Sequence, residues 1–169
     1  MNKKQIQQIL TDNFVDFWPI YLLSEINRFR NMTEAAGSPV DAHIMQVIAW
    51  SYLLTTTLDQ NMEEKDFKSV LSAWNVGLPK GKGKKDRLGK RLTVSSIAHQ
   101  TSIAFETVRR RVAKLEKKGF ITNSREHGIL LNPKSEFNKE ILQVLHPMEQ
   151  KSIVNLFHVF IGYMKGQDR

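Results

Sequence analysis

Residues 91–133 read RLTVSSIAHQTSIAFETVRRRVAKLEKKGFITNSREHGILLNP, and they carry the clearest structural pattern in the chain. Its apolar pattern predicts two short helices followed by a two-stranded ribbon. Thr93 stands where a helix N-cap should stand, and four residues after it form one stripe at helical spacing: Val94, Ile97, Ala98 and Thr101. A tight link at 102–104 leads into a second predicted helix over 105–118.

The second predicted helix has two chemically different faces. A buried stripe is expected from Val108, Val112 and Leu115, spaced i, i+4 and i+7. The remaining face is mostly polar and basic, with Glu106, Thr107, Arg109, Arg110, Ala113, Lys114 and Lys117. Such a helix can fill a DNA major groove, where each base pair shows a distinct pattern of donors and acceptors. Arg109 and Arg110 lie in its first half, the part that usually meets base edges.

The end of this stretch predicts a small ribbon. Gly119 is expected to end the second helix as a left-handed cap. The runs 120–122 and 129–131 are rich in β-prone residues and surround a polar turn that contains Gly128. Helix, link, helix, glycine and ribbon therefore follow one another in order.

These residues resemble a known family. The pattern is Ile97-Ala98-x-x-Thr101-x-Ile103-x-x-x-Thr107-Val108-x-Arg110-x-Val112-x-x-Leu115-x-x-x-Gly119-x-Ile121, over roughly a quarter of the chain. It is similar to the winged helix-turn-helix of bacterial transcription regulators, with the MarR and Crp groups the closest. Many relatives have Leu, Gly and Ser where this chain has Thr101, Ser102 and Ala104. The absence of a serine cap at Ala104 weakens the helix start by about 1 kcal/mol. The phosphate contact that such a serine would make is then expected from Ser102 or Thr107.

The resemblance implies a mainly α fold with a small β-wing, in which a winged helix-turn-helix is flanked by N-terminal and C-terminal helices. It implies a transcription regulator that binds double-stranded DNA sequence-specifically, with 105–118 in the major groove and the wing, 120–131, on the minor groove or phosphates. The candidate DNA-binding residues are Thr101, Ser102, Phe105, Glu106, Thr107, Arg109, Arg110, Lys114, Arg125 and His127, together with Lys84, Lys85, Arg87 and Arg91. The alternative is a winged-helix module that binds protein or RNA and no operator.

The placement of charge supports a polyanionic partner. The formal net charge is +8, and residues 80–118 hold 13 Lys and Arg against 3 Asp and Glu. Residues 1–79 hold 6 against 9, and residues 119–169 hold 6 against 5. Positive charge is therefore concentrated on the predicted DNA-binding module and the segment before it. A membrane surface is disfavoured, because no predicted helix pairs a basic face with a wide apolar one.

Composition divides the chain into four parts. Residues 1–79 form an N-terminal helical region for dimerisation or effector binding, and residues 91–134 form the DNA-binding domain. Between them, the basic linker 80–90 reads KGKGKKDRLGK. Glycine and charge argue against a packed element there, so it is expected to track phosphates, to remain a solvated hinge, or to order only on DNA. Residues 135–169 form C-terminal helices for dimerisation.

Four helices are predicted before the linker. The first, 2–12, turns Ile6, Ile9 and Leu10 inward, and the second, ending near Arg30, buries Leu22, Ile26 and Phe29. Ser38, Pro39 and Asp41 begin a central helix that ends near Leu58, and a fourth helix buries Phe67, Val70, Leu71 and Trp74. Nine of the fifteen aromatic residues precede residue 80. They suggest either a pocket for a small apolar effector or plain core packing, and we favour core packing.

The last helix carries more apolar surface than one small module needs. It follows a shorter helix over 136–145, and Pro147 is expected to open it. Its stripe consists of Ile153, Leu156, Phe157, Phe160, Ile161 and Met164, and Val154 and Val159 add a second apolar side. We interpret this helix as packing both on the N-terminal helices and on a second subunit, which predicts a homodimer; the alternative is burial within one chain.

Several chemistries find no support in the sequence. There is no cysteine, and KGKGKK lacks the spacing of a phosphate-binding loop. The five histidines do not cluster at metal-ligand spacing. We expect neither enzyme activity, nor a cofactor, nor a metal site. No signal peptide is visible, and the most apolar stretch, 40–58, is too polar to span a membrane, so we expect a cytoplasmic protein.

Overall fold

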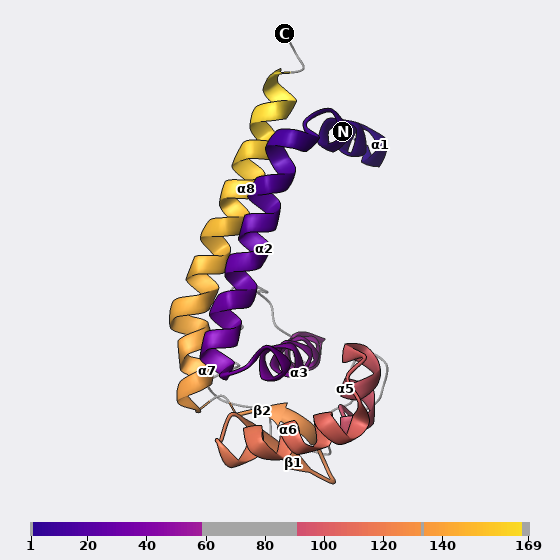
Figure 1. Ribbon diagram of the computed structural model, residues 1–169, viewed down its shortest axis with the longest axis vertical. Helices are drawn as coiled ribbons and strands as arrows, with labels where there is room; N and C mark the ends of the chain where they lie inside the picture. Colours follow the sequence, from indigo (N-terminus) through magenta and orange to yellow (C-terminus); the bar gives the residue numbers. More distant parts are fainter. Residues whose placement is uncertain (1, 59–90, 133, 167–169) are drawn as a thin grey trace.

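The computed structural model describes residues 2–58, 91–132 and 134–166 (Figure 1). This part of the chain is mainly helical with one small antiparallel sheet, as the sequence predicts. In chain order the elements are α1 (Lys3–Asp12), α2 (Phe14–Ala36), α3 (Pro39–Leu58), α5 (Val94–Thr101), α6 (Phe105–Lys117), β1 (Ile121–Ser124), β2 (Gly128–Leu131), α7 (Glu136–Glu140), a π-helical segment (Ile141–Leu145) and α8 (His146–Gly166).

Two long helices form an arm that projects from a smaller body. α2 and α8 run antiparallel, side by side, and we call this pair the arm (Figure 1). α1 lies near one end of the arm. α3, α5, α6 and the two strands gather at the other end, where they form the body. The fold therefore holds the region of residues 91–131 at one extreme of the molecule.

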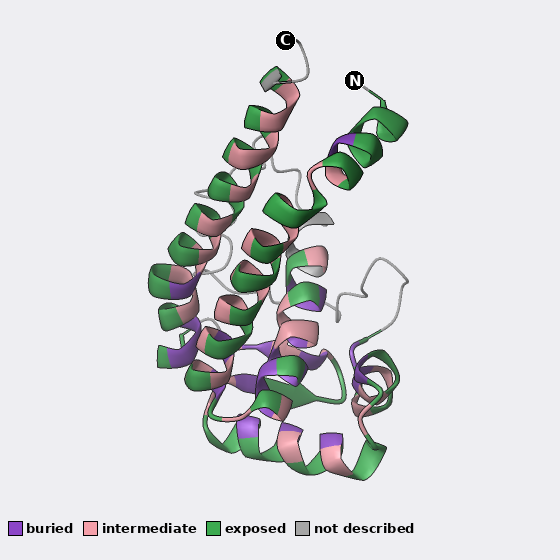
Figure 2. Ribbon diagram, turned by 45° about the horizontal axis from the view of Figure 1, so that its top comes forward, coloured by how far each residue is buried: buried purple, intermediate pink, exposed green. Residues whose placement is uncertain are grey.

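The core lies in the body, where α3 packs against α5, α6 and the sheet (Figure 2). α3 is central, as expected, because it is apolar on more than one face. The fully buried side chains include Ile44, Met45, Ile48 and Tyr52 of α3, and Ile97, Val108, Leu115, Ile121 and Ile129 from the other elements. The predicted stripe of α6, Val108, Val112 and Leu115, is buried as a whole.

Local signals set the limits of α5 and α6 as the sequence predicts. Thr93 is the N-cap of α5, and its Oγ1 accepts a hydrogen bond from the Ser96 N–H at 3.2 Å. After α6, Gly119 takes a φ of 74°, and the Phe120 N–H donates to the Leu115 carbonyl at 3.1 Å. Ala104 stands at the N-cap of α6 and makes no side-chain capping bond, which agrees with the expected loss of a cap.

The ribbon is held against the segment that precedes α5. β1 and β2 pair antiparallel with Ile121 opposite Leu131, and the Ile129 N–H donates to the Leu92 carbonyl at 3.0 Å. Gly128 has a φ of 75°, and a Cβ built there would lie 2.6 Å from the Leu92 oxygen. Only glycine fits at that position, because both the backbone angle and the close approach exclude a side chain.

The second helix differs from the prediction in length and in burial. α2 continues beyond Arg30 to Ala36, where Gly37 ends it with a φ of 89°. The expected stripe Leu22, Ile26 and Phe29 is exposed. This prediction was wrong because α2 carries apolar residues on two faces, and the face that packs against α8 includes Phe17, Tyr21 and Ser24. In α1, Ile9 is buried as predicted, whereas Ile6 remains exposed.

The C-terminal helices also differ, because they form one continuous element. α7 passes into the π-helical segment, where the His146 N–H donates to the Ile141 carbonyl, and then directly into α8. Pro147 therefore lies just inside α8 and does not begin a separate helix. A proline ring clashes with the carbonyl four residues before it and supplies no N–H, so a wider turn at this point relieves the conflict.

Candidate nucleic-acid interface

α6 presents its polar face to solvent and its apolar face to the core. Glu106, Arg109, Arg110, Ala113, Lys114 and Lys117 are exposed, and Thr107 is half-buried. At 100° per residue, Arg110 and Lys117 lie near the middle of the exposed side, two turns apart. Phe105 is also exposed, at the first position of the helix. The structure therefore gathers most of the candidate residues of this helix on one accessible surface.

Two oppositely charged residues on that surface bind each other. The Arg109 Nε and Nη2 donate to the two carboxylate oxygens of Glu106 at 2.9 and 2.7 Å. This hydrogen bond is the main cause that holds the pKa of Glu106 below its usual value and raises the pKa of Arg109. Arg110 makes no hydrogen bond or ion pair with any described residue. Of the two arginines in the first half of α6, Arg110 is therefore the one whose guanidinium is available.

The link before α6 requires one correction. Thr101 does not reach solvent, because it is buried, its Oγ1 donates to the Ile97 carbonyl at 2.8 Å, and the same oxygen accepts from the Ile103 N–H at 3.3 Å. Thr101 is a packing residue, and we remove it from the candidate DNA contacts. Ser102 is exposed and takes a left-handed conformation with a φ of 56°.

The ribbon tip brings together residues that lie far apart in the sequence. The Arg91 Nη1 donates to the carbonyl of Arg125, and both side chains are exposed beside the turn between the strands. His127 is half-buried, and its N–H donates to the Ser124 hydroxyl at 3.0 Å. Glu126 lies next to it, with 3.7 Å between a carboxylate oxygen and the His127 Nε2. Lys84, Lys85 and Arg87 of the basic linker, and the predicted helix before it, lie outside the described residues.

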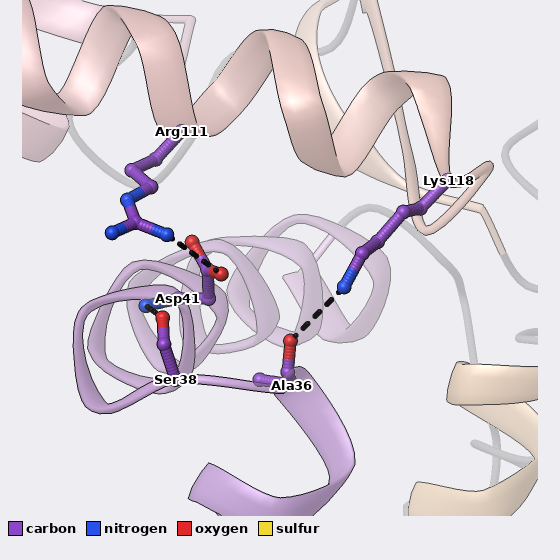
Figure 3. Close-up of polar contacts among 5 residues, drawn as sticks. All are labelled: Ala36, Ser38, Asp41, Arg111 and Lys118. Atoms are coloured by element: carbon purple, nitrogen blue, oxygen red, sulfur yellow. Dashed lines mark hydrogen bonds and ion pairs between the residues drawn. The ribbon is translucent and has the colours of Figure 1, made fainter.

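Two basic residues, Arg111 of α6 and Lys118 at its C-cap, contact the corner between α2 and α3, and the sequence interpretation missed them (Figure 3). Arg111 and Lys118, at spacing i, i+7, lie on the flank of α6 that faces the corner between α2 and α3. The Arg111 Nη1 lies 3.4 Å from the Oδ2 of Asp41, which is completely buried, and the Lys118 Nζ lies 3.4 Å from the Ala36 carbonyl oxygen. Their spacing could have indicated a common flank, but nothing in the sequence indicates Asp41 as the partner.

Most of the N-terminal aromatic residues that the structure describes do not belong to a packed core. Among those described, only Tyr52 is buried, and Phe14, Phe29 and Trp50 are exposed. Core packing, the interpretation we favoured, is therefore wrong for most of them, because the arm extends beyond the body. An open apolar groove does exist on the arm, lined by Ile6, Leu10, Phe17, Ile153, Leu156, Phe157 and Phe160.

No protein-family model, curated protein or solved structure matches this chain. Within the described residues, no helix is long and apolar enough to cross a membrane. The same residues contain no group of three or more His, Asp or Glu side chains that could hold a metal ion. The geometry of α6, the ribbon and the arm is therefore the basis from which a function can be proposed.

Proposed function

We propose that this chain is a cytoplasmic transcription regulator that binds double-stranded DNA sequence-specifically. Residues 91–131 would act as a winged helix-turn-helix, with α6 in the major groove and the ribbon on the minor groove or its phosphates. The observation that carries the proposal is the two-sided character of α6. One side is buried through Val108, Val112 and Leu115, whereas the other presents Arg110 and Lys117 to solvent at the end of the molecule.

The ribbon supports the same reading. Arg125 lies at the tip of the ribbon, which follows α6 directly, and Arg91, from the segment before α5, lies beside it. Two guanidinium groups beside an exposed turn suit phosphate oxygens or a narrow minor groove, where arginine is favoured. Together with α6 they form two basic contact points, which is how a winged module fixes its register on a duplex.

We further propose that the protein acts as a homodimer through the arm. We assign nine of the exposed apolar side chains of α1, α2 and α8 to this interface: Ile6, Val15, Leu22, Ile26, Phe29, Ile153, Val154, Phe157 and Ile161. At about half exposure each, they offer on the order of 900 Å² of apolar surface, close to what one partner contributes to a standard interface. The α2 stripe faces away from α8, so under two-fold symmetry the stripe of each copy can pack on the α8 side of the other.

A second copy fits this surface better than an effector does. The groove between α1 and α8 is open along its length and continues into exposed residues, whereas effector pockets enclose most of their ligand. A dimer would also present two copies of α6, which doubles the base contacts on a palindromic site with half-sites about 10 bp apart or a multiple of that.

Selection from a random duplex library tests the proposal. Arg110 can donate two bonds to guanine, so Arg110→Ala should cost about 1–3 kcal/mol on the best site and relax preference at one base pair. Glu106→Ala should change the preferred sequence with little loss of non-specific affinity, because it removes a negative charge and releases Arg109. An Arg110→Ala preference profile identical to that of the parent at every position would defeat the base-reading role.

The same experiment separates the alternative function. Random single-stranded RNA and random duplex DNA are offered at equal concentration, with binding measured at the same ionic strength. Selection of a duplex sequence supports the regulator. Preference for RNA, or no enrichment from either pool, would instead point to a winged-helix module for RNA or protein.

A further inference from the structure

The corner between α2 and α3 holds α6 at two points, and both contacts are electrostatic. Arg111 meets the Asp41 carboxylate in the first turn of α3, and Lys118 meets the last carbonyl of α2, that of Ala36 (Figure 3). The contacts lie on either side of Gly37, whose φ of 89° turns the chain sharply. α6 and its C-cap are thus attached both to the end of α2 and to the beginning of α3.

Each contact has a physical reason to persist. Asp41 is fully buried and its Oδ1 finds no hydrogen-bond partner among the described residues, so the 3.4 Å contact from Arg111 to Oδ2 supplies the nearby positive charge that a buried carboxylate needs. Lys118 lies at the carbonyl end of α2, where the helix dipole favours a cation. The Asp41 backbone is itself fixed, because its N–H donates to the Ser38 hydroxyl at 3.1 Å.

Arg111 differs from the basic residues on the exposed face of α6. Arg111 is about one-third exposed, and its charge is directed toward the protein, whereas Arg110 and Lys117 point to solvent. A residue that neutralises Asp41 cannot neutralise a phosphate at the same time. The contiguous triplet Arg109, Arg110 and Arg111 is therefore divided among Glu106, the solvent and Asp41.

We propose that Asp41 and Arg111 are positioning residues, which set the angle between α6 and the arm and thereby the half-site spacing that the protein accepts. This inference rests on the proposed DNA-binding function, because spacing has meaning only if α6 reads DNA. Since α2 belongs to the proposed dimer interface and ends at the corner that holds α6, loosening the corner frees α6 without disturbing the interface.

The geometry is tested first without DNA. The chain has no cysteine, so Glu34→Cys on α2 and Ala113→Cys on α6 place two spin labels, and dilution with unlabelled protein isolates the distance within one copy. The parent should give a narrow distance distribution, and Asp41→Asn or Arg111→Met a clearly broader one. The distance distribution of the double variant should be no broader than that of either single variant, because each substitution removes the same contact between Asp41 and Arg111. An unchanged distribution in Asp41→Asn would overturn the proposal.

The second measurement uses duplexes with the selected half-sites one to three base pairs closer or farther apart. Asp41→Asn and Arg111→Met should reduce discrimination between spacings by roughly 5- to 10-fold, with non-specific affinity kept. Lys117→Met, on the exposed face of the same helix, is the matched control and should lower the salt slope by about one unit with spacing preference intact. If Arg111→Met behaved like Lys117→Met, Arg111 would be a phosphate contact and the assignment would fail.

The two measurements distinguish the failure of this inference from failure of the proposed function. If Asp41→Asn broadens the distance distribution but the parent protein selects no duplex sequence, Asp41 still positions α6, and the proposed sequence-specific binding of DNA is contradicted. If Asp41→Asn does not fold, Arg111→Met alone carries both tests, because methionine keeps most of the packing of the arginine stem.

Discussion

Ala104 illustrates how one side chain affects the stability of the first turn of α6. It occupies the N-cap of α6 with a φ of −53° and a ψ of 133°, and it offers no acceptor to the free N–H groups of the first turn. Ala104→Ser should raise the free energy of unfolding by about 1 kcal/mol, measured by chemical denaturation. If the new hydroxyl also contacts a phosphate, affinity for DNA should rise as well.

Ala113→Ser is the matched control for this prediction. Ala113 is exposed in the interior of the same helix, where serine is a poorer helix former than alanine. This variant should lose roughly 0.5 kcal/mol. An Ala104→Ser variant that is no more stable than the parent would mean that the first turn of α6 is already satisfied by water.

At the residue scale, the features that were predicted correctly are those that short-range interactions along the chain determine. Thr93 as a cap, Gly119 as a left-handed terminus and the buried stripe of α6 all follow from short-range spacing, and the structure confirms them. The pairing of Arg111 with Asp41 joins residues 70 positions apart, so no spacing rule could reveal it. Thr101 was predicted both in the stripe of the first helix and among the DNA contacts; its burial agrees with the stripe, and only the DNA contact was wrong.

At the scale of elements, periodicity located the helices but could not say which apolar face each one buries. α2 has apolar residues on two sides, and the sequence pattern favoured the side that the structure leaves exposed. α8 behaves similarly: Leu156 and Phe160 are half-buried, whereas Ile153, Phe157 and Ile161 are exposed. A helix whose two faces are both apolar is ambiguous to any periodicity argument, since the choice depends on a partner element elsewhere in the chain.

This division of α8 gives two different outcomes for two phenylalanines. Phe157 is 61% exposed, so Phe157→Asp should change the fold of one copy little. It should weaken association of the proposed dimer tenfold or more, which is the loss expected for a residue near the centre of an interface. Phe160 lies with its ring centre 6.5 Å from that of Phe17, so Phe160→Asp should loosen α8 from α2 and lower thermal stability. Sedimentation equilibrium and circular dichroism separate the two effects.

Asn155→Asp is the control for the added charge, because Asn155 is exposed on the other side of α8. It should leave association unchanged. A parent protein that sediments as a monomer at micromolar concentration, both alone and with DNA, would rule out the dimer altogether.

At the scale of the whole molecule, the basic face of α6 and the exposed apolar stripes lie at different places. Among the described residues, the exposed cations of α6 and the ribbon tip occupy the body, and the exposed apolar side chains occupy mainly the arm. Such a separation lets polyanion binding and self-association be changed independently. A variant made monomeric through the arm should therefore retain non-specific affinity for DNA and lose specific affinity for a palindromic site.

The basic segment predicts a strong salt dependence of DNA binding. If a dimer neutralises roughly 6–10 phosphates, affinity should fall by about 10³–10⁵ between 50 and 200 mM salt. The slope of log affinity against log salt measures this directly. Lys84→Ala or Lys85→Ala in the linker should lower the slope by about one unit and weaken all sequences nearly equally. A flat response to salt would show that the basic segment does not follow the phosphate backbone.

The π-helical turn at 141–145 has a consequence for which way α8 faces. It takes up one residue more than an α-turn does, so the later side chains keep the phase that a helix one residue shorter would give them. If 141–145 formed an ordinary α-turn with every residue kept, each later side chain would turn by roughly 100°, and Leu156 and Phe160 would turn away from α2. Deletion of Val144, combined with Pro147→Ala to remove the proline conflict, should instead restore an ordinary helix and leave the same residues of α8 facing α2. The shortened protein should therefore associate as the parent does and resist heat at least as well.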